Sequence, residues 1–252
     1  RRGSGQPIPG AGTVRIVVAG APPPSKTIER VEAELGWEFI QIYGLTETAP
    51  LLTINRAPGE WDGLEPAERA RRQSRAGVPA IGVSIRTDED GEVLARSNHV
   101  FAGYWQQPQE SAAVLGGGWF RTGDKGHIEA GEYLVISDRK KDVIISGGEN
   151  VSSVEVEDCL YQHPSVAEVA VIGVPHPKWG ETVKALVVLR DGTAEATDAE
   201  QALIEHCRAR LAHYKCPTSV EVREALPRTA TGKLQKFRLR APYWEGYDRG
   251  IN

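Results

Sequence analysis

Polar residues follow several strand-like stretches of this sequence, at positions where a parallel sheet would present loops to a ligand. Thr46 and Glu47 come after the stretch 38–43, and a hydroxyl next to a carboxylate suits a phosphate group and Mg²⁺. Asp124 lies in RTGDKG, where its carboxylate could accept hydrogen bonds from neighbouring hydroxyls of a sugar. Arg139 follows another strand-like stretch and offers a planar fork of donors. Taken singly, each could instead be a turn residue or one member of a surface ion pair.

Lys233 lies in LPRTATGKLQK, whose Pro, Thr and Gly residues predict a loop that holds one ammonium away from the domain body. An ammonium near an α-phosphate would stabilise the charge that gathers there when a carboxylate attacks. At about 4 Å and an effective dielectric of about 20, it contributes on the order of 4 kcal/mol, or roughly three decades in rate. The segment is not a P-loop, because Leu234 replaces the required Ser or Thr and the earlier glycine is missing.

The elements that must position these residues begin with a predicted βαβ unit. The stretch 13–19 is rich in β-branched residues, and the prolines of the following GAPPPS exclude both a strand and a helix interior. Ser25 is predicted to cap a helix whose apolar residues recur at helical spacing up to Gly36. The stretch 38–43 is the next strand. Short links between these elements predict a parallel pair with its ligand-binding loops at the carboxyl ends.

Two hairpin patterns predict a β-rich subdomain after this unit. Residues 82–97 alternate around the turn DEDG, and residues 126–137 repeat the pattern around EAGE. The composition changes again near residue 140, where we place a domain boundary. The fold class is therefore α/β for residues 1–140, followed by a small α+β domain over residues 141–252.

Capping boxes and apolar runs predict the second domain. Ser152 with Glu155, and Thr197 with Glu200, have the spacing of two capping boxes that begin helices. The runs VAEVAVIGV, TVKALVVL and SVEV predict three strands. Two or three helices with two or three strands suffice for a small α+β domain.

Composition excludes several classes of protein. With 30 Lys and Arg against 34 Asp and Glu, the net charge of −4 excludes a generally basic protein that coats nucleic acid. No apolar run approaches the ~20 residues of a membrane span, and no apolar stretch near the first residues suggests a signal peptide. Cys159, Cys207 and Cys216 lack CxxC spacing, which favours a reducing compartment. These features predict a cytoplasmic protein with no nucleic-acid partner and no transmembrane segment.

Five segments together are far more specific than any single motif. The strings AGAPPP, YGLTE, GWFRTGD, DRKKDVIISGGENVSSVEVE and PRTATGK resemble, in order and spacing, the signature blocks of the adenylate-forming superfamily. That superfamily contains acyl-CoA synthetases, luciferases and the adenylation domains of peptide synthetases. ISGGENVSSVEVE and PHPKWGE are most similar to the acyl-CoA synthetase branch. The resemblance implies that residues 1–140 end a large nucleotide- and acyl-binding domain, and that residues 141–252 form a mobile lid.

The resemblance also implies a role for particular residues. It places Gly20, Ala21 and Pro22 along the adenine pocket, with Tyr43 stacked on the base and Gly44 in the loop that follows. Thr46 would contact phosphate. Asp124 would bind the ribose hydroxyls, with Arg139 assisting.

The remaining implied roles concern the metal, the reaction and CoA. Glu47 would hold Mg²⁺, and Lys233 would be the lysine of the adenylation reaction. Lys141 would be the hinge of the mobile domain, although a solvated linker lysine explains it equally well. Gly147 and Gly148 would line the path of the pantetheine arm of CoA, where glycines leave room beside the backbone.

The function implied is an acyl-CoA synthetase that uses ATP, Mg²⁺ and CoA to activate a fatty acid or another hydrophobic carboxylic acid. The loop that would hold the β and γ phosphates of ATP is absent and there are no methionines, so we expect a C-terminal fragment that is inactive without its N-terminal part. An adenylation domain or acyl-AMP ligase that loads a carrier protein is one alternative. A non-catalytic binding fragment is another, and a homo-oligomer is left open.

Overall fold

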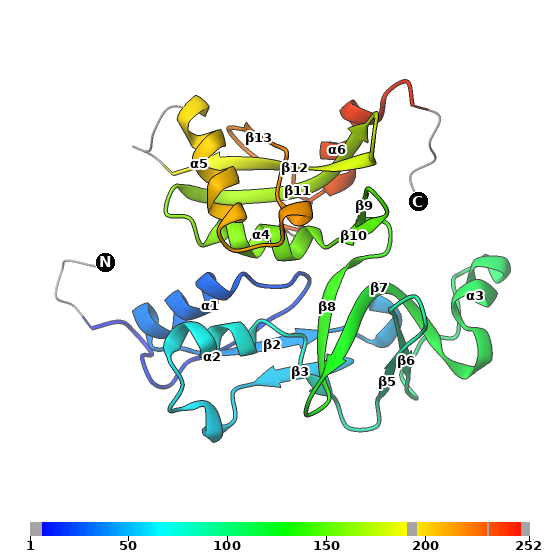
Figure 1. The fold of residues 1–252 in the computed structure, drawn as a ribbon. Helices are drawn as coiled ribbons and strands as arrows, with labels where there is room; N and C mark the ends of the chain where they lie inside the picture. Colours follow the sequence, from blue (N-terminus) through cyan, green and yellow to red (C-terminus); the bar gives the residue numbers. More distant parts are fainter. Residues whose placement is uncertain (1–6, 191–195, 231, 248–252) are drawn as a thin grey trace. The chain divides into compact units, whose positions relative to one another are not determined.

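The computed structural model describes residues 7–190, 196–230 and 232–247. The chain forms two compact units, Arg1–Ile136 and Ser137–Asn252, called unit 1 and unit 2 below (Figure 1). The division lies within strand β8 (Tyr133–Arg139), a few residues before the boundary expected near residue 140.

The first sheet of unit 1 contains the predicted βαβ unit. Its strands are β1 (Arg15–Val18), β2 (Glu38–Tyr43), β3 (Thr53–Arg56) and β4 (Val78–Pro79), in that order. β1 and β2 pair in parallel, as predicted, and the other neighbours are antiparallel. Helices α1 (Ser25–Arg30) and α2 (Pro66–Gln73) pack together over β2, with Ile28, Phe39 and Ala70 at the centre of the contact (Figure 1).

The start of α1 differs from the prediction. Pro24, with φ −58° and ψ 135°, takes the cap position, and Ser25 is already the first helical residue. Proline fits here because its fixed φ leads into a helix and it needs no donor of its own. After Arg30 the chain continues as a π-helical turn, Val31–Leu35. Gly36 then ends the helix at φ +65°, a left-handed conformation that glycine adopts without strain, as expected.

The second sheet of unit 1 is the predicted β-rich subdomain. Its order is β5 (Ser84–Thr87), β6 (Glu92–Arg96), β7 (Phe120–Glu129) and β8, so both expected hairpins are present. Short helical segments connect the strands of unit 1: Thr46–Thr48, Gly59–Trp61, α3 (Pro108–Val114) and Gly116–Gly118. Leu52, Ala95 and Phe120 form one core cluster, and Ala76, Val93 and Leu134 form another.

Unit 2 is an α+β unit with helices on both faces of one sheet. The sheet order is β10 (Glu149–Val151), β9 (Ile144–Ser146), β12 (Gly180–Leu189) and β11 (Val166–His176), and β13 (Ser219–Val222) pairs in parallel with β12. The helices are α4 (Ser153–Tyr161), α5 (Ala196–Arg208), a short turn His213–Lys215, and α6 (Lys236–Trp244). All three strands predicted for this domain are therefore confirmed.

The alternation of β11 explains this layering. Val169 and Val171 belong to the cluster under α4 and α5, whereas Ala170 and Ile172 belong to the cluster that includes Leu239 of α6. Successive side chains of a strand point to opposite faces, so a strand covered on both sides must be apolar throughout. This is why VAEVAVIGV contains a continuous apolar run.

At the first predicted capping box the Ser152 bond forms while the Glu155 carboxylate pairs with Lys215, and the second predicted helix begins before Thr197. Oγ of Ser152 accepts a hydrogen bond of 3.2 Å from the backbone N–H of Glu155 at the start of α4. Helix α5 begins at Ala196, so Thr197 lies inside the helix rather than before it. Oε1 of Glu200 instead accepts a 2.9 Å hydrogen bond from the backbone of Val220, because β13 packs beside α5.

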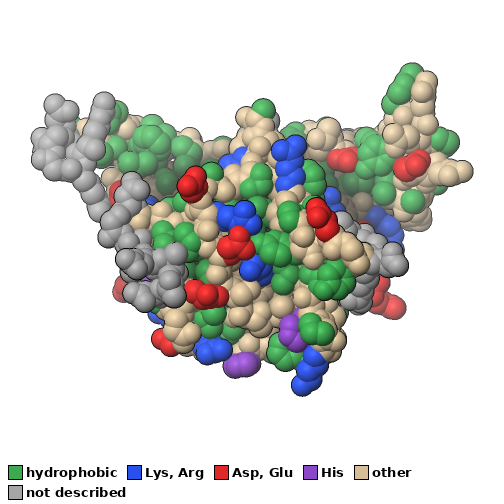
Figure 2. All heavy atoms as spheres, turned by 90° about the horizontal axis from the view of Figure 1, so that it is seen from above, with side chains coloured by type: hydrophobic (Ala, Val, Ile, Leu, Met, Phe, Trp, Pro, Cys, Tyr) green, Lys and Arg blue, Asp and Glu red, His purple; other side chains and the backbone are tan. Residues whose placement is uncertain are grey.

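The surface fits the composition. Figure 2 shows Lys and Arg side chains interspersed with Asp and Glu across the face in view, as a net charge of −4 suggests. No helix in the described part of the chain combines the length and apolar content needed to cross a membrane. Cys159, Cys207 and Cys216 are free and buried, as small hydrophobic residues would be.

Two histidines of unit 2 should make its stability depend on pH. The rings of His163 and His206 meet edge to face at 5.1 Å, and burial, helped by the positive charge of Arg210, lowers the pKa of His163 below its ordinary value of 6.5. Burial also lowers the pKa of His206. The unfolded chain therefore binds more protons than the folded chain just below pH 6.5, so the free energy of unfolding falls as pH drops through that window.

We predict that the His206→Gln variant shows a shallower loss of stability between about pH 7 and pH 5 in urea denaturation. Glutamine can still donate to the Cys159 carbonyl, which accepts from His206 at 3.0 Å. Gln201→Ala, on the exposed side of the same helix, is the control and should keep the original slope. Equal slopes for His206→Gln and the parent chain would contradict the assignment.

Candidate functional site

The carboxyl edge of the first sheet collects the loops that sequence analysis singled out. Because Val18 pairs with Gln41 in parallel, residues 20–22 and residues 44–47 leave the sheet at the same edge. Residues 20–22 are exposed, and Gly20 has a φ of +94°. The predicted adenine and phosphate loops are therefore neighbours by topology, although their roles stay predictions.

Gly44 has a structural reason to be glycine. A Cβ atom built at this position would lie 1.6 Å from the carbonyl oxygen of Pro50, because the chain turns back tightly after β2. Leu52 closes this turn by donating from its backbone N–H to the Tyr43 carbonyl at 2.8 Å. The buried Thr48 accepts from the backbone of Leu45 at 2.9 Å. The loop that bears Thr46 and Glu47 is thus held rigidly.

Tyr43 and Asp124 meet although 81 residues separate them. The Tyr43 hydroxyl donates to Oδ2 of Asp124 at 2.8 Å, and the Asp124 residue is only 4% exposed. The backbone N–H of Asp124 donates to Oγ1 of Thr122 at 3.1 Å. Tyr43 was expected to stack on a base. The structure shows in addition that its hydroxyl bonds to, and so orients, the carboxylate that was expected to bind ribose.

Glu47 and Tyr104 form a second contact that sequence analysis missed. The Tyr104 hydroxyl donates to Oε1 of Glu47 at 2.9 Å, and the Glu47 carbonyl accepts from the backbone of Phe101 at 2.8 Å. Burial, and after it the Glu47 carboxylate, raises the pKa of Tyr104, so this phenol remains a donor at neutral pH. The only sequence signal was the aromatic cluster in FAGYW, to which no role could be attached.

The donor chemistry at Glu47 suits a hard divalent cation. Among the described residues, no three His, Cys, Asp or Glu side chains gather as a metal-binding group. Mg²⁺ does not require such a group, because one or two carboxylates together with substrate phosphates commonly hold it. Glu47, with the Thr46 hydroxyl beside it, fits that mode of binding.

Other predicted residues lie in unit 2. Arg139 ends β8, and its backbone N–H donates to Oδ1 of Asp138 at 2.9 Å. Lys141 is exposed, and its carbonyl accepts from Arg240 at 2.9 Å. Gly147 and Gly148 form the turn between β9 and β10 with φ values of +61° and +89°.

The space around this turn matches the expectation of room beside the backbone. A Cβ atom at Gly148 would meet nothing within 4 Å, so its positive φ rather than crowding accounts for glycine there. The backbone N–H of Gly147 donates to the Trp179 carbonyl at 3.1 Å.

Lys233 lies in a closed loop, as its Pro, Thr and Gly neighbours predicted. Its backbone N–H donates to Oγ1 of Thr229 at 3.0 Å, and its carbonyl accepts from the Thr229 backbone at 2.8 Å. Arg228 and Leu234 form an isolated bridge at the base of the loop. Lys233 is exposed and lies opposite Thr229, where the loop closes. Among the predicted residues, the described side-chain contacts join Tyr43 to Asp124, and the role of Lys233 stays a prediction.

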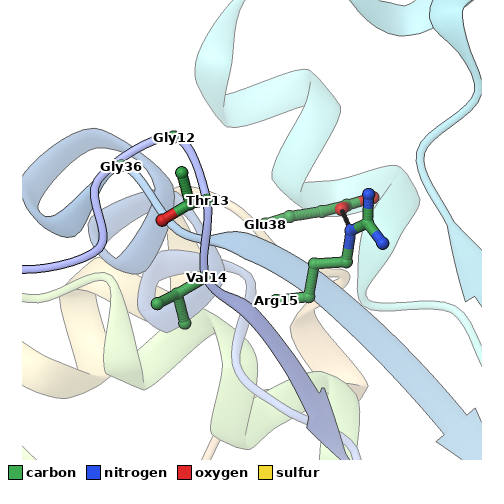
Figure 3. A pocket seen from close by; sticks show the side chains of 6 residues that line it. All are labelled: Gly12, Thr13, Val14, Arg15, Gly36 and Glu38. Atoms are coloured by element: carbon green, nitrogen blue, oxygen red, sulfur yellow. Dashed lines mark hydrogen bonds and ion pairs between the residues drawn. The ribbon is translucent and has the colours of Figure 1, made fainter.

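A hollow at the other edge of the first sheet has no part in this site (Figure 3). It lies at the amino ends of β1 and β2, where Nε of Arg15 and Oε2 of Glu38 form an ion pair at 2.8 Å. Ligands of parallel sheets bind beyond the carboxyl ends of the strands, so this hollow is on the wrong edge. Its lining consists of Gly12, Thr13, Val14, Arg15, Gly36 and Glu38.

Known proteins share both the sequence blocks and this architecture. Residues 6–105 match the family described as AMP-binding enzyme, and residues 155–233 match the AMP-binding enzyme C-terminal domain. The 2-methylpropanoate–CoA ligase of Humulus lupulus is 45% identical over 243 residues, which cover 90% of this chain and 43% of the relative.

Solved structures agree. The crystal structure of an anthranilate CoA ligase in complex with anthranoyl-AMP has a TM-score of 0.81 and 31% identity, covering 92% of this chain and 45% of that one. The amide bond synthetase of Marinactinospora thermotolerans has a TM-score of 0.79 and 33% identity, covering 92% of this chain and 47% of that one. The class shared by fold and sequence is that of adenylate-forming enzymes.

This chain belongs to the family of AMP-binding enzymes and matches the C-terminal portion of such an enzyme. It spans less than half the length of the relatives named here, the shares being 43%, 45% and 47%. The predicted family and fold class are thereby confirmed.

We predict that Gly44→Ala destabilises unit 1. Overpacking typically costs about 1–3 kcal/mol, and a contact with backbone rather than with a flexible side chain favours the upper end. Gly63→Ala is the matched control, because a Cβ atom there would meet nothing within 4 Å. Urea denaturation should show a clear loss for the first variant and a change within about 0.5 kcal/mol for the second. Equal midpoints for both variants would show that the turn after β2 is not tight.

Proposed function

We propose that this chain is the C-terminal part of an ATP- and Mg²⁺-dependent acyl-CoA ligase that acts on a fatty acid or another hydrophobic carboxylic acid. The observation that carries the proposal is the pair of contacts at one sheet edge, Tyr43 with Asp124 and Glu47 with Tyr104, on a chain of this family. These contacts orient two carboxylates beside loops suited to a nucleotide.

In the first half-reaction, an oxygen of the acid attacks the α-phosphorus of ATP, the bond to the bridging oxygen breaks, and pyrophosphate leaves. Residues 20–22 and Tyr43 would hold the adenine, Thr46 the phosphate, and Asp124 the ribose. A carboxylate that already accepts from Tyr43 keeps its orientation, so it can accept from ribose hydroxyls with little loss of conformational freedom. Arg139 would assist as a donor.

Mg²⁺ bound at Glu47 would neutralise charge on the phosphate oxygens. Tyr104 would fix one oxygen of the Glu47 carboxylate by donating to it. Lys233 would place its ammonium at the reacting phosphate, where charge develops, without exchanging a proton. Its exposed position in a loop supports this proposal.

In the second half-reaction, the thiol of CoA attacks the acyl carbonyl, a thioester forms, and AMP leaves. Charge then develops at a different atom, so one active site would need a moving domain to serve both steps. Residues 141–252 are the proposed lid and Lys141 its hinge. The open turn at Gly147 and Gly148 would let the pantetheine arm pass the backbone.

A carrier protein is the alternative acceptor of the acyl group. An amide bond synthetase among the structural relatives supports keeping the acceptor open, since its name denotes an amide product. The experiment supplies the complete enzyme with ATP and acid, together with either CoA or a carrier protein. An acyl-adenylate that never becomes acyl-CoA would exclude the CoA ligase.

The proposal also includes a cellular compartment and a set of binding partners. The free, buried cysteines support a reducing compartment such as the cytoplasm. The proposed partners are the acid, ATP, CoA and the N-terminal part of the enzyme, which would supply the loop for the β and γ phosphates. We therefore expect that this chain by itself does not catalyse the reaction of ATP with the acid.

We predict that Lys233→Ala in the complete enzyme lowers adenylate formation by roughly three decades, because one cation is removed from the reacting phosphate. Thioester formation from supplied acyl-adenylate should stay within about tenfold, since that step does not use the ammonium. Lys26→Ala, which removes an exposed ion pair on α1, is the control and should leave both steps unchanged. A parallel fall of both half-reactions would overturn the role of Lys233.

A second prediction tests whether this chain alone retains part of the nucleotide site. Calorimetry of this chain with AMP should detect binding that Asp124→Ala abolishes, because the carboxylate contacts the ribose. Asp90→Ala, in the exposed turn between β5 and β6, is the control and should bind like the parent chain. Binding that survives Asp124→Ala would place the nucleotide elsewhere.

A further inference from the structure

Lys236 has an unusual environment for a lysine. It is the first residue of α6, close in sequence to Lys233, yet its side chain is only 15% exposed. Its Nζ lies 2.7 Å from Oε1 of Glu157 on α4, whose side chain is 16% exposed, and it also donates to Oγ of Ser153. An ammonium removed from water in this way is stable only when it is paired and hydrogen-bonded.

The network continues from Ser153 to the end of β8. Oδ2 of Asp138 accepts from the backbone N–H of Ser153 at 2.7 Å and from its hydroxyl at 2.6 Å, and Asp138 is 3% exposed. Burial raises the pKa of Asp138 and of Glu157. Burial alone would lower the pKa of Lys236, but these two carboxylates outweigh it and raise the pKa, so the amine stays charged.

A second tie holds α6 one turn further on, at residues 141 and 142. Arg240, 8% exposed, donates through Nη1 to the Lys141 carbonyl at 2.9 Å and through Nη2 to Oδ1 of Asp142 at 3.0 Å. Residues 141 and 142, at the start of the proposed lid, are therefore bonded directly to α6. A helix held at both ends of a turn has little freedom to slide or rotate.

The loop of Lys233 depends on this anchored helix. Only Leu234 and Gln235 separate Lys233 from α6, and Gln235 donates from its backbone to the Pro227 carbonyl at 2.9 Å. On the other side of the loop, Arg228 pairs with Glu168 of β11 at 2.7 Å. A shift of the first turn of α6 would therefore also shift the backbone of Lys233.

We propose that Lys236 is a positioning residue for Lys233: its buried pairing with Glu157 and Ser153 fastens the first turn of α6 to α4, so that the Lys233 loop moves rigidly with the proposed lid. The proposal rests on the proposed role of Lys233. It predicts a defect confined to adenylate formation, because a misplacement of about 1 Å in a group that stabilises charge can cost about 100-fold.

The test compares three variants of the complete enzyme in the two half-reactions. Lys236→Met keeps the length of the side chain but leaves Glu157 unpaired, and it should slow adenylate formation about 10- to 100-fold. Thioester formation from supplied acyl-adenylate should stay within about threefold. Lys236→Arg, which can pair with Glu157, should restore adenylate formation to within about fivefold.

Lys184→Met is the matched control. Lys184 is also 15% exposed and also pairs with a carboxylate, Glu221 at 3.4 Å, but this pair contacts α6 at Tyr243, near the end of the helix rather than in its first turn. It should change stability without changing either half-reaction. If Lys236→Met does not fold, Glu157→Gln serves in its place, because the amide keeps the shape of the carboxylate while removing its charge, and the same split is expected.

The outcomes separate this inference from the proposed function. If Lys233→Ala leaves adenylate formation intact, the role of Lys233 is wrong. If Lys233→Ala abolishes it, but Lys236→Met slows both half-reactions equally or neither, Lys236 merely stabilises the fold and the inference is overturned.

Discussion

Because β1 and β2 run parallel, the loops after Val18 and Tyr43 leave the first sheet at one edge, and the candidate nucleotide site depends on that pairing. An antiparallel pairing would send these loops to opposite edges. The helix between the strands makes the parallel connection, and its apolar face, anchored by Ile28, packs on the sheet. Asp124 then reaches the same edge from the second sheet by accepting from Tyr43.

In unit 2, the exposed residue Lys233 lies between segments that are closely bonded to the rest of the unit. A charged side chain needs water or a partner, and a loop long enough to expose it would by itself be mobile. The structure uses a short loop closed by backbone bonds, followed by a helix whose first residue is a buried lysine. Two lysines within four residues therefore have opposite environments: Lys233 is exposed, and Lys236 is buried in an ion pair.

Two tyrosine hydroxyls of unit 1 make the same kind of contact. Tyr43 and Tyr104 each donate to a carboxylate at the sheet edge, Asp124 in one case and Glu47 in the other. A carboxylate with one oxygen already bonded pays less entropy when a ligand arrives. The tyrosines thus help to fix the orientation of these two acceptors.

The sequence by itself determined the parallel pair β1 and β2, both hairpins, strands β11 to β13, the loop of Lys233 and the family, because these depend on local periodicity, turn chemistry and ordered motifs. It did not indicate β3, β4, β9 or β10. It placed two helix starts one or two residues too late. Ser25, the predicted cap of α1, is already its first helical residue, and α5 begins at Ala196, before the predicted cap Thr197. Only the tertiary structure decided the partners of Tyr43, Glu47 and Lys236. Those partners lie 81, 57 and 83 residues away in the hydrogen bonds concerned, and no local pattern specifies which distant segments the topology will bring together.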